Sequence, residues 1–145
     1  MTTVPGGLYI DANILIYAVE ATGETGERAK SLLQAARDAG LMLVSSELMI
    51  AECLRGPLKT GHTARVAEYR NMFARPDDLR LLPITRAISE ASTLIAAKTG
   101  AKLFDAIHLA TAVAAGCDAF VTNDKGIHHP EGLKLLRFWA DFPRQ

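Results

Sequence analysis

Short apolar runs alternate along this chain with segments whose apolar residues recur at helical spacing, and this alternation constrains the fold most. The runs predict short strands at residues 8–10, 41–44, 79–84, 119–121 and 133–138. Helices are predicted between them, at residues 27–39, from Ser45 or Ser46 through Leu54, at 66–73, at 85–99 and at 103–115. Strands that alternate with helices predict a three-layer α/β/α sandwich around a mainly parallel, twisted sheet of 4–5 strands.

Prolines and glycines mark the expected ends of these elements. Gly56 and Pro57 are predicted to end the helix that passes through Leu54, because proline lacks a backbone N–H. Pro83 predicts that the strand at 79–84 lies at an edge of the sheet or ends there.

Composition limits the classes of protein that fit. The chain has 145 residues, which predicts a single domain over residues 1–145. Sixteen Lys and Arg balance sixteen Asp and Glu, so no general surplus of positive charge is present for coating nucleic acid or an anionic membrane. Two cysteines cannot form a disulfide framework, and no signal peptide or membrane-spanning run is found. A cytoplasmic protein is expected.

Four acidic residues stand where a parallel sheet would gather them. Asp11 directly follows the first strand, and Asp124 follows the strand at 119–121. Asp105 begins an apolar helix, and Glu52 lies in the helix after the second strand. Ligands of such sheets bind at the carboxyl ends of the strands, so these side chains are the first candidates for chemistry.

Each acid also has a purely structural explanation. Asp11 or Asn13 can cap a helix, and Asp105 is favoured at a helix start by the macrodipole. The Thr122-Asn123-Asp124 run suits a turn, and Glu52 can pair with Arg55 on a helix surface.

The combination of the four acids indicates a metal site. Carboxylates that meet in one crevice repel one another unless a cation neutralises them. Oxygen ligands without Cys or His favour Mg²⁺ or Mn²⁺, which activate water and bind phosphate oxygens. The pattern therefore suggests a metal-dependent phosphodiesterase.

Four segments resemble the motifs of PIN-domain ribonucleases, in the same order and over residues 8 to about 138. They are Ile10-Asp11-Ala12-Asn13-Ile14-Leu15, Glu52 after Val44-Ser45-Ser46, Phe104-Asp105-Ala106-Ile107-His108-Leu109-Ala110, and Val121-Thr122-Asn123-Asp124. The small size is most similar to VapC-type toxins of toxin–antitoxin pairs. After Asp124 the chain departs from the family, which often continues Asp-x-x-Phe where this chain has Lys125-Gly126-Ile127.

The resemblance implies an endoribonuclease with an RNA substrate and a bound Mg²⁺ or Mn²⁺. Asp11 and Asp105 would be the most direct metal ligands, while Asp124 and Glu52 would complete the metal shell or position the attacking water. The neighbouring polar residues would support these acids: Asn13, Thr122 and Asn123. A cognate antitoxin and a homodimer are the partners that the resemblance implies, with no membrane.

Other functions remain as alternatives. The same fold could serve as a catalytically silent module that binds RNA or protein. A haloacid-dehalogenase-type phosphatase would need an acid where Asn13 stands, and a dinucleotide-binding domain would need a glycine-rich loop after the first strand.

The histidines are expected to have no catalytic role. His108 is expected to be a structural histidine, and His128-His129 to lie in a surface loop.

Overall fold

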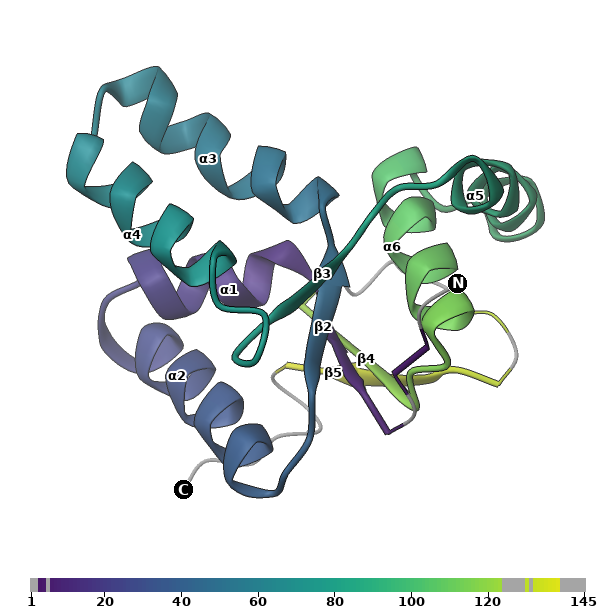
Figure 1. The fold of residues 1–145 in the computed structure, drawn as a ribbon, viewed down its shortest axis with the longest axis horizontal. Coiled ribbons are helices and arrows are strands. Elements are labelled where there is room, and N and C mark those ends of the chain that lie inside the picture. Colours follow the sequence, from purple (N-terminus) through teal and green to yellow (C-terminus); the bar gives the residue numbers. More distant parts are fainter. Residues whose placement is uncertain (1–2, 5, 124–129, 131, 139–145) are drawn as a thin grey trace.

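A computed structural model describes residues 3–4, 6–123, 130 and 132–138, without the side chain of Arg137. Within these residues a five-stranded parallel sheet has the strand order β3-β2-β1-β4-β5 (Figure 1). The strands are β1 (Leu8–Ile10), β2 (Leu43–Ser46), β3 (Arg80–Leu82), β4 (Ala119–Thr122) and β5 (Lys134–Arg137). The helices are α1 (Ala12–Glu20), α2 (Gly23–Asp38), α3 (Leu48–Thr60), α4 (Thr63–Phe73), α5 (Arg86–Thr99) and α6 (Leu103–Ala115).

The helices form layers on the two faces of the sheet, as the sequence predicts. Leu8 and Ile10 of β1 belong to a core cluster with α1, α2 and α3, whereas Tyr9 belongs to a second cluster with α6. This division follows from the alternation of side chains along a strand. In Figure 1, α1 to α4 lie on one side of the sheet and α5 and α6 on the other.

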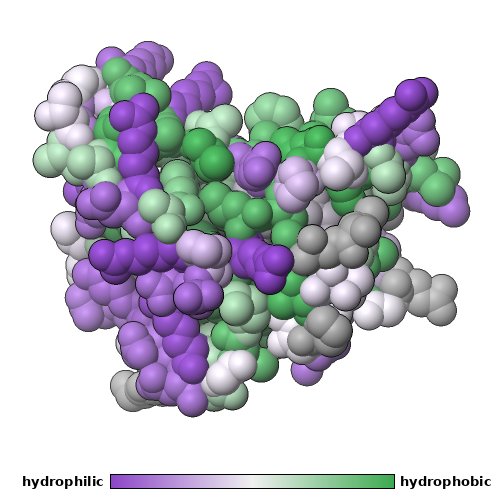
Figure 2. Space-filling model, in the orientation of Figure 1, coloured by the Kyte–Doolittle hydropathy of each residue, from purple (hydrophilic) through white to green (hydrophobic). Residues whose placement is uncertain are grey.

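The distribution of hydrophilic and hydrophobic side chains on the surface agrees with this layering. On the face shown in Figure 2, hydrophilic side chains cover the region of α2, at the lower left, and hydrophobic ones gather toward the middle and upper part. The buried residues of α2 include Ala29, Leu32, Leu33 and Ala36, which recur at helical spacing. The helix therefore presents one apolar stripe to the core.

The second strand begins two residues later than the sequence predicts. It pairs with β1 through Leu8 opposite Leu43 and Tyr9 opposite Val44, and it includes both serines that were expected to lie beyond it. A buried strand accommodates Ser45 because its hydroxyl donates to the carbonyl of Ile10 at 2.9 Å.

The prediction that Gly56 and Pro57 end a helix is wrong. Helix α3 continues through Pro57 to Thr60 and ends at Gly61, whose φ is 70°. Gly56 has no Cβ to clash with the following proline ring, so the helical conformation is accessible there. Pro57 also extends the buried side of α3, and this packing offsets the hydrogen bond that proline cannot make.

Other predicted boundaries agree with the structure within a few residues. The third strand lies at an edge of the sheet, as Pro83 indicates, and Thr85 caps α5 by accepting from the amide of Ile88 at 3.2 Å. Helix α2 begins at Gly23, earlier than predicted, because its first turn packs against the end of α1. In the described part of the chain, no helix has the length and apolar character needed to cross a membrane.

Candidate active site

Asp11 is held at the carboxyl ends of two adjacent strands. It follows β1 and caps α1, where its Oδ1 accepts from the amide of Ala12 at 2.8 Å. The hydroxyl of Thr122, the last residue of β4, donates to its Oδ2 at 2.7 Å. The parallel register of β1 and β4 pairs Ile10 with Val121 and so places these two side chains together. Asp11 can therefore cap α1 and still take part in a site.

The environment of Asp11 opposes its negative charge. The residue is only 5% exposed, and burial raises the pKa of its carboxyl above the usual 3.8. The negative charge of Glu52 raises this pKa further, whereas His108 and the hydrogen bonds from Thr122 and Ala12 lower it. A buried carboxylate beside a second acid is an environment that a cation would stabilise.

Glu52 reaches this region from α3 and contacts a histidine from the opposite helical layer. Its Oε1 lies 2.5 Å from Nε2 of His108, a buried residue of α6. The other ring nitrogen of His108, Nδ1, lies 2.6 Å from the hydroxyl of Tyr9 on β1. The contact with His108 therefore directs the Glu52 side chain toward the site, so Glu52 is not only a surface partner of Arg55.

Asp105 lies on the same helix as His108, one turn closer to the helix start. It stands in the first turn of α6 and is partly exposed. Side chains three residues apart lie on one side of a helix, so Asp105 and His108 share a side of α6. The remaining predicted acid, Asp124, lies outside the described residues, as do Lys125-Gly126-Ile127, His128 and His129.

The predicted supporting residues have different surroundings. Thr122 contacts Asp11 directly, as above. Asn123 donates from Nδ2 to the hydroxyl of Tyr17 at 2.9 Å and thereby connects the end of β4 to α1. Asn13 places a buried Oδ1 where no hydrogen-bond partner is found for it among the described residues. A buried carbonyl oxygen two residues from Asp11 is a further acceptor for a cation or its water.

The oxygen donors fit a hard divalent ion better than a zinc ion. Within the residues that the structure describes, no three His, Cys, Asp or Glu side chains form a group that could enclose a metal. Among the described residues, the donors predicted to hold an ion are the carboxylates of Asp11 and Asp105, and Oδ1 of Asn13 is a further oxygen close to Asp11 in the sequence. Such oxygens are the ligands that Mg²⁺ and Mn²⁺ prefer.

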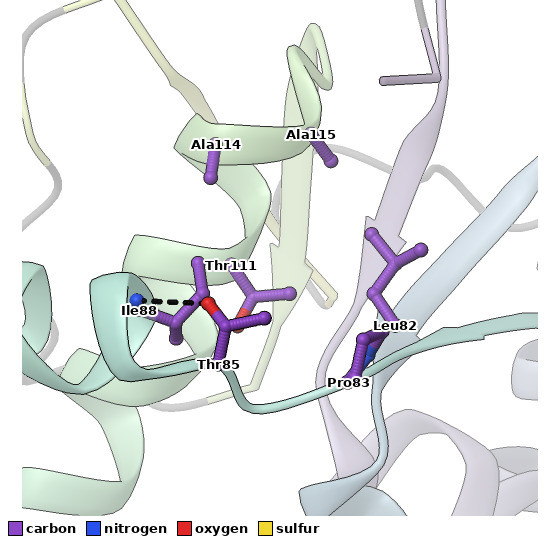
Figure 3. Close-up of a pocket in the computed structure, with 7 residues that line it drawn as sticks. All are labelled: Leu82, Pro83, Thr85, Ile88, Thr111, Ala114 and Ala115. Carbon is purple, nitrogen blue, oxygen red and sulfur yellow. Dashed lines mark hydrogen bonds between the residues drawn. The ribbon is translucent and has the colours of Figure 1, made fainter. Parts of the chain in front are cut away.

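A separate cavity lies between α5, α6 and the end of β3 (Figure 3). Its volume is about 170 Å³, and no residue that lines it is titratable: Leu82, Pro83, Thr85, Ile88, Thr111, Ala114 and Ala115. This apolar cavity cannot supply the charge that a metal or a phosphate would need, so the acidic edge of the sheet remains the candidate site.

The sequence did not predict the side-chain contacts of two buried residues near the candidate site, His108 and Tyr9. His108 is buried, as expected of a structural histidine, but it also contacts Glu52. Tyr9 was predicted only as part of a strand. Their positions, one turn after Asp105 and two residues before Asp11, were the available signals, and neither predicts that the two side chains meet.

Comparisons with solved structures find the same fold in several bacterial proteins. A toxin–antitoxin complex from Klebsiella pneumoniae contains a chain that is 22% identical, with a TM-score of 0.67 over 92% of this chain and 98% of that one. A DNA-bound VapBC from Salmonella typhimurium gives 14% identity and a TM-score of 0.72 over 96% and 100%. VapC20 of Mycobacterium tuberculosis, described as a sarcin–ricin loop cleaving toxin, gives 16% and 0.65 over 79% and 87%.

These TM-scores establish a shared fold. A search of curated proteins found no match. The sequence itself matches the family model of the PIN domain over residues 8–133, from the start of β1 to the residue before β5. Because that match covers most of the chain, the protein belongs to the PIN-domain family.

Proposed function

We propose that this protein is an endoribonuclease that requires Mg²⁺ or Mn²⁺ and acts as the toxin of a toxin–antitoxin pair. The observation that carries the proposal is the buried Asp11 carboxylate, held by Thr122 and Ala12 in the electrostatic field of Glu52 within a PIN domain. Toxin–antitoxin complexes among the similar structures support the assignment to such a pair.

The chain's own residues would bind and orient the reacting groups. Asp11 and Asp105 would hold the ion, with Asp124 as a further ligand, and Asn13 would accept from its water or bind it directly. A bound Mg²⁺ or Mn²⁺ supplies hydroxide from water and neutralises charge on the phosphate. Glu52 would accept a hydrogen bond from the attacking water, and Thr122 keeps Asp11 oriented.

Partners follow from the same proposal. An antitoxin would bind the acidic edge of the sheet and block access of RNA, and a second copy of the chain would complete a homodimer. A cytoplasmic location fits a protein that acts on cellular RNA.

Cleavage of RNA by the purified chain tests the proposal. Total cellular RNA is incubated with the protein and Mn²⁺ or Mg²⁺, with EDTA in parallel. We expect discrete products that EDTA abolishes. Asp11→Asn and Asp105→Asn should lower the rate on the order of a hundredfold or more, because each removes a charge that holds the ion.

Asp38→Asn is the matched control, because this exposed aspartate at the end of α2 lies in a different element from the site. It should retain the wild-type rate. Full activity of Asp11→Asn would remove that residue from the mechanism. Absence of cleavage in every sample, while the protein still binds RNA, would favour the catalytically silent module.

A further inference from the structure

A series of hydrogen bonds runs from the face of the sheet that packs against α6 to the acidic edge. It joins the hydroxyl of Tyr9 on β1 to Nδ1 of His108 on α6 at 2.6 Å, and Nε2 of His108 to Oε1 of Glu52 on α3 at 2.5 Å. Residues 99 and 56 positions apart thereby meet. We propose that Tyr9 and His108 are positioning residues that hold the Glu52 carboxylate beside Asp11, an inference that rests on the function proposed above.

The direction of the hydrogen bonds is consistent with this role. The hydroxyl of Tyr9 can donate to Nδ1 of a neutral His108 ring, 2.6 Å away. That ring then carries its own proton on Nε2, toward Glu52. A protonated ring also carries a proton on Nε2. In both states His108 donates to Glu52, so its orienting function does not depend on its charge.

Exposure to solvent increases along the three hydrogen-bonded residues toward the candidate site, which indicates that their function lies there. Tyr9 is 0% exposed and His108 is 1% exposed, whereas the side chain of Glu52 is 23% exposed. Tyr9 also stacks on Phe120, with ring centroids 5.0 Å apart, in the apolar cluster between the sheet and α6. Packing alone would be satisfied by apolar side chains, which need no partners in a buried cluster. Of the three hydrogen-bonded side chains, that of Glu52 alone is accessible to solvent.

Fixing Glu52 matters because its side chain is long. A glutamate loses considerable rotamer freedom when it is held in one geometry. The rigid Tyr9 and His108 rings, both packed in the core, supply that restraint before any substrate binds. Loss of the restraint should therefore lower the rate of the chemical step and leave RNA binding unchanged.

Single-turnover cleavage at saturating Mn²⁺ tests this proposal. The substrate is a synthetic RNA that spans a site mapped with the wild-type protein in total RNA. We expect His108→Leu to lower the rate about 10–100-fold, as for other groups that orient the residues of metal sites, with the Km for RNA unchanged. His108→Gln retains an N–H donor and should recover most of the lost rate. Tyr9→Phe should give a smaller loss in the same direction.

A double-mutant cycle separates positioning from damage to the core. If His108 acts through Glu52, His108→Leu should cause no further loss in a Glu52→Gln background. Leu109→Val, at the next buried position of α6, is the matched control and should keep the wild-type rate. Melting curves identify variants that fail to fold, in which case His108→Gln and Tyr9→Phe carry the test.

Two failures can be told apart. A wild-type protein that cleaves no RNA overturns the proposed function and the positioning role with it. A wild-type protein that cleaves, together with a His108→Leu variant of equal rate, overturns the positioning role alone. The same conclusion follows if His108→Leu lowers the rate by an equal factor in the Glu52→Gln background, or if His108→Gln recovers nothing.

Discussion

At the scale of single residues, Asp11 performs two tasks with its two carboxylate oxygens. One oxygen caps α1 through Ala12, and the other accepts from Thr122 on the neighbouring strand. Both bonds favour the charged carboxylate, but burial disfavours it more strongly, and the pKa of Asp11 is raised as a result. The protein thus keeps a carboxyl group in surroundings that disfavour its negative charge, which is typical of functional sites.

Replacing Asp11 by Asn should therefore stabilise the metal-free protein at neutral pH. The folded-state pKa of Asp11 lies above its usual 3.8, so its favourable contribution is complete below 3.8 and is lost as the pH rises through the folded-state value. In urea unfolding with EDTA, the free energy of unfolding of Asp11→Asn minus that of the wild type should increase from pH 4 to pH 7. A difference that decreases over this range would contradict the raised pKa.

At the scale of elements, the packing of α2 against the end of α1 depends on a glycine. A Cβ added to Gly26 would lie 2.1 Å from the carbonyl oxygen of Ala21 and 2.9 Å from its carbonyl carbon. Both are backbone atoms, which cannot rotate away. Helix α1 carries Asp11 at its start, so the α1–α2 contact also supports the element that begins at the site.

Gly26→Ala should lower the free energy of unfolding by about 1–3 kcal/mol, because the two helices must move apart to admit the methyl group. Thermal or urea unfolding measures the effect. Glu27→Ala, at the next and exposed position of α2, is the control and should change stability by less than about 1 kcal/mol. Equal stability of Gly26→Ala and the wild type would contradict the close approach of the two helices.

At the scale of the whole molecule, the site forms where two helical layers meet at one edge of the sheet. Glu52 comes from α3, in the layer of α1 and α2, and His108 comes from α6, in the opposite layer. Their hydrogen bond spans the edge at which β1 and β4 deliver Asp11 and Thr122. An ion bound there would act on several elements at once, so it should stabilise the entire fold.

Mn²⁺ or Mg²⁺ should raise the melting temperature of the wild type by mass action. A concentration about 100 times the dissociation constant corresponds to about 2.7 kcal/mol, which is roughly 5–10 °C for a domain of this size. Asp11→Asn should show no such shift, and EDTA should reverse the shift of the wild type. An unchanged wild-type melting temperature across millimolar metal would count against a bound ion, and an equal shift in Asp11→Asn would place the ion elsewhere.

Features that depend on residues close together in the sequence were predicted better than features that depend on tertiary packing. The cap at Thr85 and the edge position indicated by Pro83 depend on neighbouring residues, and the structure confirms both. The helix end predicted at Gly56 and Pro57 is wrong, because burial of Pro57 against the core outweighs the local preference of proline. Whether Asp105 and Asp124 join Asp11 and Glu52 stays a prediction.

The sequence by itself determined the parallel α/β sandwich and the positions of Asp11 and Thr122 at its carboxyl edge. Both follow from local hydrophobic periodicity and from the point at which each strand ends. Only the tertiary structure decided that Glu52 meets His108 and that His108 meets Tyr9. Those contacts depend on how α3 and α6 are placed across the sheet. That placement results from the packing of two separate cores, which no local pattern encodes.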